Sequence, residues 1–538
     1  MPAAQAPDSR IDTRPVVRSR ATVLWGLVIF AAWAAIVAVG ELHHVFWRDE
    51  VRALSLALDA DSMLSIPAAI HGEGHPALWY LLLRTSYDIF GTQMVLPLVS
   101  MLVAAAAVII FLWRAPFSLW WKALFVLSAI PAYEYSVMAR NYGIAMLLMF
   151  LYAALYIGQR RSPFWLGVIL FLLAQTNIIA NLLIPFYLFI WLCDWRSARK
   201  SGSDPADPFL WMVLAAVMAC AGMLAAFATV YPTTHDLMLH TYPDDWLEIL
   251  RGIGSAILQP GHFYCGPPVS VWGTICPAGG PLAQTVTTAV LYLAVAGLAL
   301  HLPLLLAALG SLWATTLFFR FVYPGDYRHQ AIWVVFLITL YWFEFAHQFR
   351  SLHHTRNPIK RRLFLLSFYG ALATILAIHT GVRRVYTDIV TQTSKSRAVG
   401  NLLQTTELKN AIIVAEPEEI AEAIPYYAHN DIYLLREAKF GKVATWSSHT
   451  SKLNLTLHDL IVTARDLKDK TGRPILILLE YPVTQVEPQQ IAKFASTSSG
   501  MWRFRYDSDE AREFLAATRR LPSGPRARLE DFEVYLLQ

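Results

Sequence analysis

The stretch "TVLWGLVIFAAWAAIVAVG", residues 22–40, decides the class of this fold. It carries no charged side chain, and its length is close to the roughly 20 apolar residues that a transmembrane helix needs. The preceding stretch "RIDTRPVVRSR", residues 10–20, is basic. A secretory signal peptide has a similar flank but a shorter apolar region, and here further apolar runs follow. We therefore predict a retained first transmembrane helix, with a cytoplasmic tail over residues 1–21.

The rest of the chain is similarly apolar. Of its 538 residues, 56% are hydrophobic and 15% are charged, and the mean hydropathy is +0.42. Soluble domains carry roughly 25% charged residues, so we predict a polytopic α-helical membrane protein with about 11–13 spans. The net charge of +5 is small and most basic residues fall in short loops, which argues against a nucleic-acid surface. The further apolar runs lie at residues 94–112, 118–132, 139–157, 163–175, 178–193, 209–231, 285–319, 331–346 and 363–381.

The charge of the loops predicts the orientation of the chain. The loops at 158–162, 193–202 and 347–362 are basic and should be cytoplasmic, which places the alternate loops and everything after residue 382 on the other side. The stretch "HPALWYLLLRTSYDIFG", residues 75–91, is the exception, because it is apolar enough to enter the membrane but contains two charged residues. Either it is re-entrant, or it spans fully and inverts the parity. We expect a multi-pass protein of a cell membrane, typically the bacterial inner membrane, with residues 382–538 in the periplasm.

After residue 382 the composition becomes that of a soluble domain. The stretches "NAIIVAE" (410–416) and "RPILILLEYPV" (473–483) predict buried strands, and "LTLHDLIVTARDLKDKTG" (455–472) predicts a helix that ends at its glycine. Alternating strands and helices predict a small α/β domain. Four cysteines are too few for a disulfide scaffold, but Cys265 and Cys276 share one loop and could bridge if that loop faces an oxidising space.

An acidic pair follows the first apolar run, in "WRDEVRALSLAL" (47–58). Adjacent residues do not share one face of a helix, so Asp49 and Glu50 should have different partners and different roles. Asp49 is suited to cap an amphipathic helix on the membrane surface. Charged groups near a bilayer are costly and therefore also candidates for catalysis. The two roles are compatible, since a carboxylate at a helix N-terminus stays ionised and oriented.

Three more polar clusters fall between apolar runs. In "HGEGHPALWY" (71–80), alternate residues of an extended segment would face one side, so that His71, Glu73 and His75 are weak candidates for a metal site; such loops more often face water. In "PAYEYSVMARNYGIAML" (131–147), an arginine stands among tyrosines and a glutamate. This setting favours an arginine that binds a specific phosphate over one that only anchors the chain at the lipid surface. In "FFRFVYPGDYRHQAIW" (318–333), an aromatic belt explains the rings, whereas Arg328 and His329 indicate an anionic headgroup.

Taken in order, these motifs resemble the GT-C superfamily of membrane glycosyltransferases, in particular the branch with protein O-mannosyltransferases and lipid A aminoarabinose transferases. The ordered features are the Asp49-Glu50 pair, the "HPALWY" that begins at His75, the "R-x-Y" of Arg140 and Tyr142, and a polar loop between late spans. The resemblance covers residues 22–381, a transmembrane catalytic domain with an outer loop at 41–75. Two positions depart from the common pattern, Met138 in place of a glutamate and Ala77 in place of a second proline.

The resemblance implies transfer of a sugar from a polyprenyl-phosphate carrier to a lipid, glycan or protein acceptor outside the cytoplasm, with inversion. Asp49 would be the general base and Glu50 would orient the acceptor or a metal. Cations would stabilise the departing phosphate. No cofactor is implied beyond the divalent cation that the loop at 71–75 could hold. The alternatives are a transporter or lipid flippase, and a polysaccharide ligase or polymerase. The candidate substrate-binding residues are Arg48, His75, Tyr133, Glu134, Arg140, Tyr142, Arg328 and His329.

Overall fold

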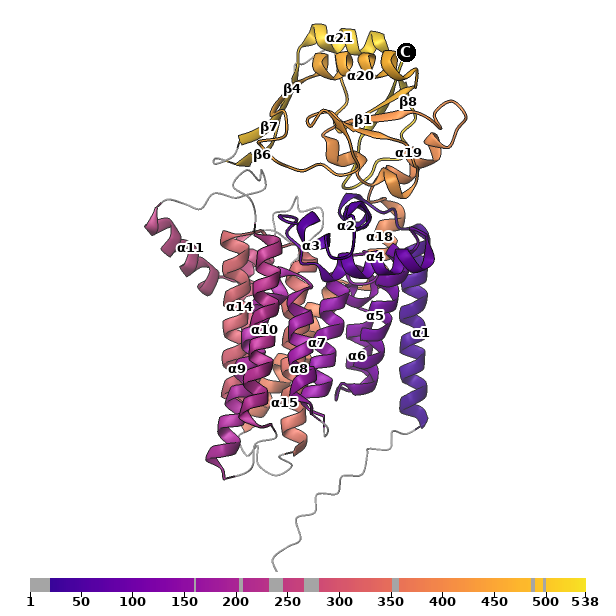
Figure 1. Ribbon diagram of the computed structural model, residues 1–538. Coiled ribbons are helices and arrows are strands. Elements are labelled where there is room, and N and C mark those ends of the chain that lie inside the picture. Colours follow the sequence, from indigo (N-terminus) through magenta and orange to yellow (C-terminus); the bar gives the residue numbers. More distant parts are fainter. Residues whose placement is uncertain are drawn as a thin grey trace, which may run out of the picture.

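The computed structural model describes residues 20–158, 161–202, 207–231, 245–265, 280–350, 358–484, 489–496 and 500–538. A bundle of long helices carries a mixed α/β domain at one end (Figure 1). This arrangement confirms the predicted fold class. The end of the bundle next to the C-terminal domain is called the domain-side end below.

Eight helices in the described part of the chain are long and apolar enough to cross a membrane. They are α1 (Arg20–His43), α5 (Val95–Arg114), α9 (Ile178–Lys200), α10 (Phe209–Val230), α13 (Pro281–Ala296, continued by η2, Gly297–Leu300), α14 (Leu302–Phe321), α15 (Tyr327–Arg350) and the run α16–η3–α17 (Pro358–Leu365, Leu366–Leu372 and Ala373–Ile378). This number is below the predicted 11–13. The other predicted runs form helices of fewer than 18 residues, α6 (Leu119–Val126, followed by η1, Ile130–Glu134), α7 (Tyr142–Tyr156) and α8 (Pro163–Ala174).

The ambiguous stretch at 75–91 forms α4 (Leu78–Phe90), which lies across the domain-side end of the bundle below α2 (Arg48–Asp59) and α3 (Ile66–Ala69) (Figure 1). Its 13 residues reach only about 20 Å, short of the roughly 30 Å of a hydrocarbon core. Arg84 donates to Asp88 and to the carbonyls of Ala57 and Ala60 at the end of α2. Because α4 does not run along the bundle, it does not count as a span. The assignment of the later loops to the two sides of the membrane, predicted from the basic loops, therefore does not have to be reversed.

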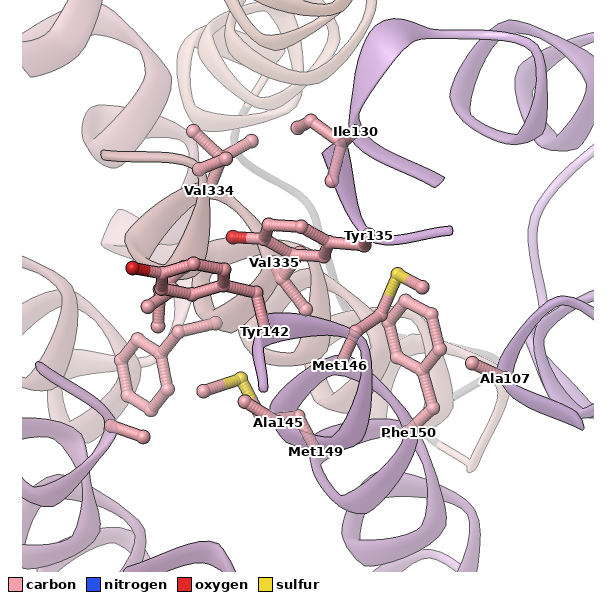
Figure 2. Close-up of a cluster of buried hydrophobic side chains, with 14 of the residues drawn as sticks. Ala107, Ile130, Tyr135, Tyr142, Ala145, Met146, Met149, Phe150, Val334 and Val335 are labelled. Atoms are coloured by element: carbon pink, nitrogen blue, oxygen red, sulfur yellow. The ribbon is translucent and has the colours of Figure 1, made fainter. Parts of the chain in front are cut away.

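One part of the buried core of the bundle lies beneath the domain-side ends of α7 and α15. Side chains of α7 pack there with Tyr135, Val334 and Val335 (Figure 2). The rings of Tyr135 and Tyr142 are stacked with centroids 5.8 Å apart. Close packing of this kind resists displacement, so the N-termini of α7 and α15 have fixed positions. Both helices begin at or next to a predicted site residue.

The C-terminal domain contains a six-stranded sheet in the order β3-β2-β1-β5-β9-β8, in which β1, β2 and β5 are parallel, and a three-stranded sheet β4-β7-β6. Helices α20 and α21 cover one face of the larger sheet and α19 the other, which is why β1 and β5 read as continuous apolar runs. The predicted strands and the helix ending at Gly472 are confirmed. The elements are β1 (Ile412–Glu416), β2 (Ile432–Leu434), β3 (Lys439–Phe440), β4 (Asn454–Thr456), β5 (Ile475–Leu479), β6 (Gln489–Ser496), β7 (Gly500–Tyr506), β8 (Thr518–Leu521), β9 (Glu533–Leu537), α19 (Ser396–Leu403), α20 (Leu457–Thr471) and α21 (Ser508–Ala517).

Two connecting regions complete the fold. The predicted boundary at residue 382 falls in α18 (Gly381–Val390), which packs against α1. Between α10 and α13, α11 (Trp246–Leu258) and α12 (Gly261–Tyr264) lead to the buried Cys265. Its predicted partner in a disulfide, Cys276, lies outside the described residues.

Candidate active site

The carboxylate of Asp49, in the first turn of α2, lies among three arginines. Arg140 Nη1 is 2.6 Å and Arg328 Nη2 3.8 Å from Asp49 Oδ2, and Arg48 Nε donates to Oδ1 at 3.2 Å. Arg140 and Arg328 are buried, while the side chain of Asp49 remains 22% exposed. Solvent or a substrate can therefore reach the carboxylate. The guanidinium groups of Arg140 and Arg328 are less accessible than the carboxylate.

The site is assembled from segments far apart in the sequence. Asp49 comes from α2, Arg140 from the turn before α7, and Arg328 from the first turn of α15. All three helices begin here, and helix N-termini add positive potential to that of the arginines. Arg140 and Arg328 could thus bind an anionic group with one or two negative charges, next to the Asp49 carboxylate, which could accept a proton.

His75 is positioned by Arg140, which donates from Nη2 to His75 Nε2 at 2.7 Å. An arginine can only donate, so the imidazole proton is on Nδ1 and the ring is neutral. Burial and the charges of Arg140 and Arg328 outweigh Asp49 and lower the pKa of His75 to about 3. His75 therefore orients Arg140 and supplies no positive charge of its own.

Tyr142 and His329 form a second supporting pair below the arginines. The backbone N–H of Asp326 donates to His329 Nδ1 at 3.1 Å, so Nε2 carries the proton and donates to the Tyr142 hydroxyl at 2.8 Å. Both ring nitrogens of His329 are thereby used within the protein. The guanidinium of Arg140 lies 5.9 Å from the centroid of the Tyr142 ring. The pair supports Arg140 from below.

Glu50 does not share the site with Asp49. Its side chain is fully buried, and its carboxylate accepts the Ala139 N–H at 2.7 Å and faces His44 Nε2 at 2.9 Å. His44 Nδ1 is 2.6 Å from Asp388 Oδ2 of α18. Burial disfavours the charged imidazole, but Glu50 and Asp388 outweigh it and raise the pKa of His44 well above its ordinary value. Glu50 thus holds the turn that carries Arg140, with no route to an acceptor.

Replacing Glu50 by Ala should lower the free energy of unfolding by about 3–5 kcal/mol, because a buried cation then loses one partner and a buried N–H loses its acceptor. The midpoint of thermal unfolding in detergent measures this loss. Glu248→Ala is the control, since that side chain is 53% exposed and 3.6 Å from Arg320, where ion pairs contribute about 0–1 kcal/mol. Equal midpoints for the two variants would contradict the assignment.

Two other predicted substrate ligands lie apart from Asp49. Tyr133 packs edge-on against His44 with ring centroids 6.3 Å apart. Glu134 is 3.6 Å from Arg384 of α18. Both side chains are buried. Tyr133, through His44 and Asp388, and Glu134, through Arg384, contribute to the contacts between the bundle and α18. The structure does not bring them to Asp49.

The candidate metal ligands do not converge. Within the described ranges, no three His, Cys, Asp or Glu side chains are grouped so that they could hold a metal ion. His71 lies 3.1 Å from the Ala228 carbonyl, Glu73 binds Arg52, and His75 accepts from Arg140. The prediction assumed an extended segment, but Gly72 and Gly74 have φ of +86° and +75°. Such left-handed turns direct the three side chains apart.

The sequence did not reveal the part that the C-terminal domain plays at this site. Arg48 Nη1 is 3.7 Å from Glu419, and its guanidinium lies 5.8 Å from the centroid of Trp446 and 5.9 Å from that of Trp47. The only signal was a run of glutamates, "EPEEIAE" (416–422), directly after a buried strand. Nothing in that run indicates that its partners lie several hundred residues earlier.

Comparison with known proteins supports the fold. The chain resembles the crystal structure of ArnT from Cupriavidus metallidurans bound to undecaprenyl phosphate, over 96% of this chain and 98% of that one, with a TM-score of 0.50 and 10% sequence identity. No protein-family model and no curated protein matches the sequence. At this identity the similarity establishes the fold alone, and this ArnT-like fold agrees with the predicted helical membrane bundle and C-terminal α/β domain.

Proposed function

We propose that this protein is a glycosyltransferase that moves a sugar from a polyprenyl-phosphate carrier to an acceptor on the extracytoplasmic face of a membrane. The observation that carries the proposal is the partly exposed carboxylate of Asp49 against the buried guanidinium groups of Arg140 and Arg328. A carboxylate beside fixed cations matches a reaction in which a hydroxyl loses a proton while a phosphate leaves. The apolar bundle supplies the surface that a polyprenyl chain requires.

Arg140 and Arg328 are assigned to the phosphate of the donor. Charge-assisted hydrogen bonds from a guanidinium to phosphate are strong and can be bidentate. Both arginines are held by the protein, Arg140 by His75 and Arg328 by Asp326 at 3.9 Å. The similar ArnT structure contains undecaprenyl phosphate, which makes that lipid phosphate the first donor component to test.

Asp49 is assigned as the general base of a single displacement. The acceptor oxygen forms a bond to the anomeric carbon while the bond from that carbon to the phosphate oxygen breaks. The hydroxyl proton passes to Asp49, and the electron pair of the broken bond leaves with the phosphate, which the arginines stabilise. Attack opposite the leaving group inverts the anomeric configuration.

The donor should itself activate the base, and the pH dependence tests this. In the free protein burial opposes ionisation, but Arg140, Arg48 and Arg328 outweigh it and hold the pKa of Asp49 well below its usual range. A bound phosphate would compete for the arginines and add negative charge, so the pKa should rise. Because kcat/KM reports the free enzyme and kcat the complex, the acid limb of kcat should lie at higher pH than that of kcat/KM. Coincident acid limbs would refute donor activation.

The proposal as a whole is tested by lipid binding. Purified protein in nanodiscs should bind undecaprenyl phosphate at least about tenfold more tightly than undecaprenol, because only the phosphate engages the arginines. Release of undecaprenyl phosphate from an undecaprenyl-phosphate sugar on addition of membrane extract, with the sugar recovered on a component of that extract, would then establish transfer. Equal affinity for the two lipids, or transport of the intact lipid without cleavage, would overturn the proposal.

The orientation follows from the positions of the charged loops. The C-terminal end of α9, with Arg199 and Lys200 in its last turn, lies at the end of the bundle opposite the C-terminal domain (Figure 1). Basic loops stay in the cytoplasm. The site and the domain would accordingly face the other compartment, which is the periplasm if the membrane is a bacterial inner membrane.

A further inference from the structure

The polar contacts of the C-terminal domain converge on α2 and on the residues before it. Glu530 accepts the Arg48 N–H at 2.8 Å, the Tyr427 hydroxyl accepts the Phe46 N–H at 2.8 Å, and Ser396 Oγ donates to the Phe46 carbonyl at 2.8 Å. These contacts fix the path by which the chain enters α2. They hold the backbone immediately before Asp49, whereas the carboxylate of Asp49 faces the arginines of the bundle.

Arg52 is the main side-chain link between α2 and the domain. It follows Asp49 by three residues, so the two lie on neighbouring positions of one helix face. Its Nη1 donates to Glu422 Oε1 at 2.6 Å and its Nη2 to the Ala444 carbonyl at 3.0 Å. The Ala444 N–H donates to the same oxygen of Glu422 at 2.9 Å. The guanidinium is thereby enclosed by two segments of the domain.

The same guanidinium also holds the loop that contains His75. Nε and Nη2 of Arg52 donate to the two carboxylate oxygens of Glu73 at 2.7 and 2.6 Å, a bidentate pair. His75, two residues later, accepts from Arg140. Arg52 therefore connects the helix of the base, the loop that orients the phosphate-binding arginine, and the C-terminal domain.

The contacts with Arg48 and Arg52 lie at the carboxyl end of the parallel strands of the C-terminal domain. Glu422 follows β1 by a short turn, at the carboxyl end of the parallel strands β2, β1 and β5. In open α/β sheets this edge is where ligands bind. Here α2 contacts it through Arg48 and Arg52, and the side chains of Glu419 and Glu422 that meet them are buried. The sheet edge at which other α/β domains bind ligands therefore binds α2 in this protein.

We infer that Arg52 is a positioning residue for sugar transfer, and that the C-terminal domain acts in catalysis by fixing α2 through Glu422. This inference rests on the proposed function. Lysine keeps the charge, but its single ammonium nitrogen cannot reproduce the bidentate pair with Glu73 while it also reaches Glu422 and the Ala444 carbonyl. A shift of the base by about 1 Å can reduce the rate by about 100-fold, so small movements of α2 should be visible in kcat.

The test compares variants on both sides of the contact. Arg52→Lys and Glu422→Ala should each lower kcat by about 10- to 100-fold, with the affinity for undecaprenyl phosphate changed less than about threefold, since Arg140 and Arg328 remain. Glu422→Gln keeps the acceptor oxygen and should restore most of kcat. The double variant Arg52→Lys, Glu422→Ala should lose little more than the worse single one, because the two act through one contact. Arg465→Ala, an exposed pair with Glu513 on the same domain, is the control and should behave as wild type.

The outcomes separate this inference from the proposed function. Unchanged kcat in Arg52→Lys and Glu422→Ala, with an inactive Asp49→Asn, would overturn the inference alone. Parallel loss of kcat, lipid binding and thermal stability would also overturn it, because that pattern indicates a purely structural role. Retained transfer in Asp49→Asn would overturn the general-base assignment, whatever the Arg52 variants do.

Discussion

Replacing Asp49 by Asn should lower kcat for sugar transfer by about 10²- to 10⁴-fold, the usual contribution of a general base. The amide has nearly the same shape and keeps one oxygen that can accept from Arg140, so the fold should persist. It cannot take the proton of an acceptor hydroxyl. The rate of release of undecaprenyl phosphate from its sugar conjugate measures the effect, and the binding of undecaprenyl phosphate to the variant should be retained.

The matched control for this variant is Asp59→Asn at the other end of α2. Asp59 is 49% exposed and its nearest cation, Lys442, is 3.8 Å away. The Asp59→Asn substitution removes a carboxylate from the same helix but from a position away from Arg140 and Arg328. We therefore expect kcat to stay within about twofold of wild type. If Asp49→Asn turned over as fast as Asp59→Asn, the base would have to be another group.

Replacing Arg140 by Ala should impair both binding and catalysis. The removal of one preorganised donor to a developing charge typically costs about 10²–10³ in kcat. The affinity for undecaprenyl phosphate should fall by at least about tenfold, since a charge-assisted contact is lost. Arg140→Lys should recover only part of either, because lysine cannot contact Asp49, His75 and a phosphate in one plane.

The control for Arg140 is Arg84→Ala, which removes an arginine of α4 from the same end of the bundle. Arg84 contacts Asp88 and two carbonyls of α2, so its loss should change stability more than lipid binding. Titration of each variant with undecaprenyl phosphate in nanodiscs measures the affinity directly. Full affinity in Arg140→Ala would remove this arginine from the phosphate site.

The sequence was sufficient for features that depend on local pattern. Apolar runs predicted the helical membrane bundle, although fewer described helices are long enough to span than the 11–13 predicted. Short apolar runs bounded by Asn, Gly and Pro predicted β1 and β5, because burial on both faces leaves a continuous signal. The charge of the loops predicts an orientation, which stays a prediction. Length alone would have indicated that residues 78–90 are too few to span, but their hydropathy resembled that of a span.

Features that depend on contacts between distant segments could not be predicted. Both members of the acidic pair were predicted to be catalytic, but Glu50 faces His44 and the Ala139 N–H. Its direction depends on where the fold places the turn before α7 and the residues after α1. The histidines of the loop at 71–75 point apart because of two backbone angles that the letters of the sequence do not specify. Arg52 lies in the same amphipathic stretch as Asp49, and its spacing does not indicate what it contacts. Its partners Glu73 and Glu422 are 21 and 370 residues away.

The contact between Arg48 and Glu530 joins residues 482 positions apart. A ribosome therefore makes the helix of the base near the start of translation and its last support near the end. Until the final strands emerge and pack, an inserted chain has all its spans but an unsecured α2. Catalytic competence would in that case be a late event in biogenesis. A premature stop after the last span should leave a stably inserted protein that turns over no donor.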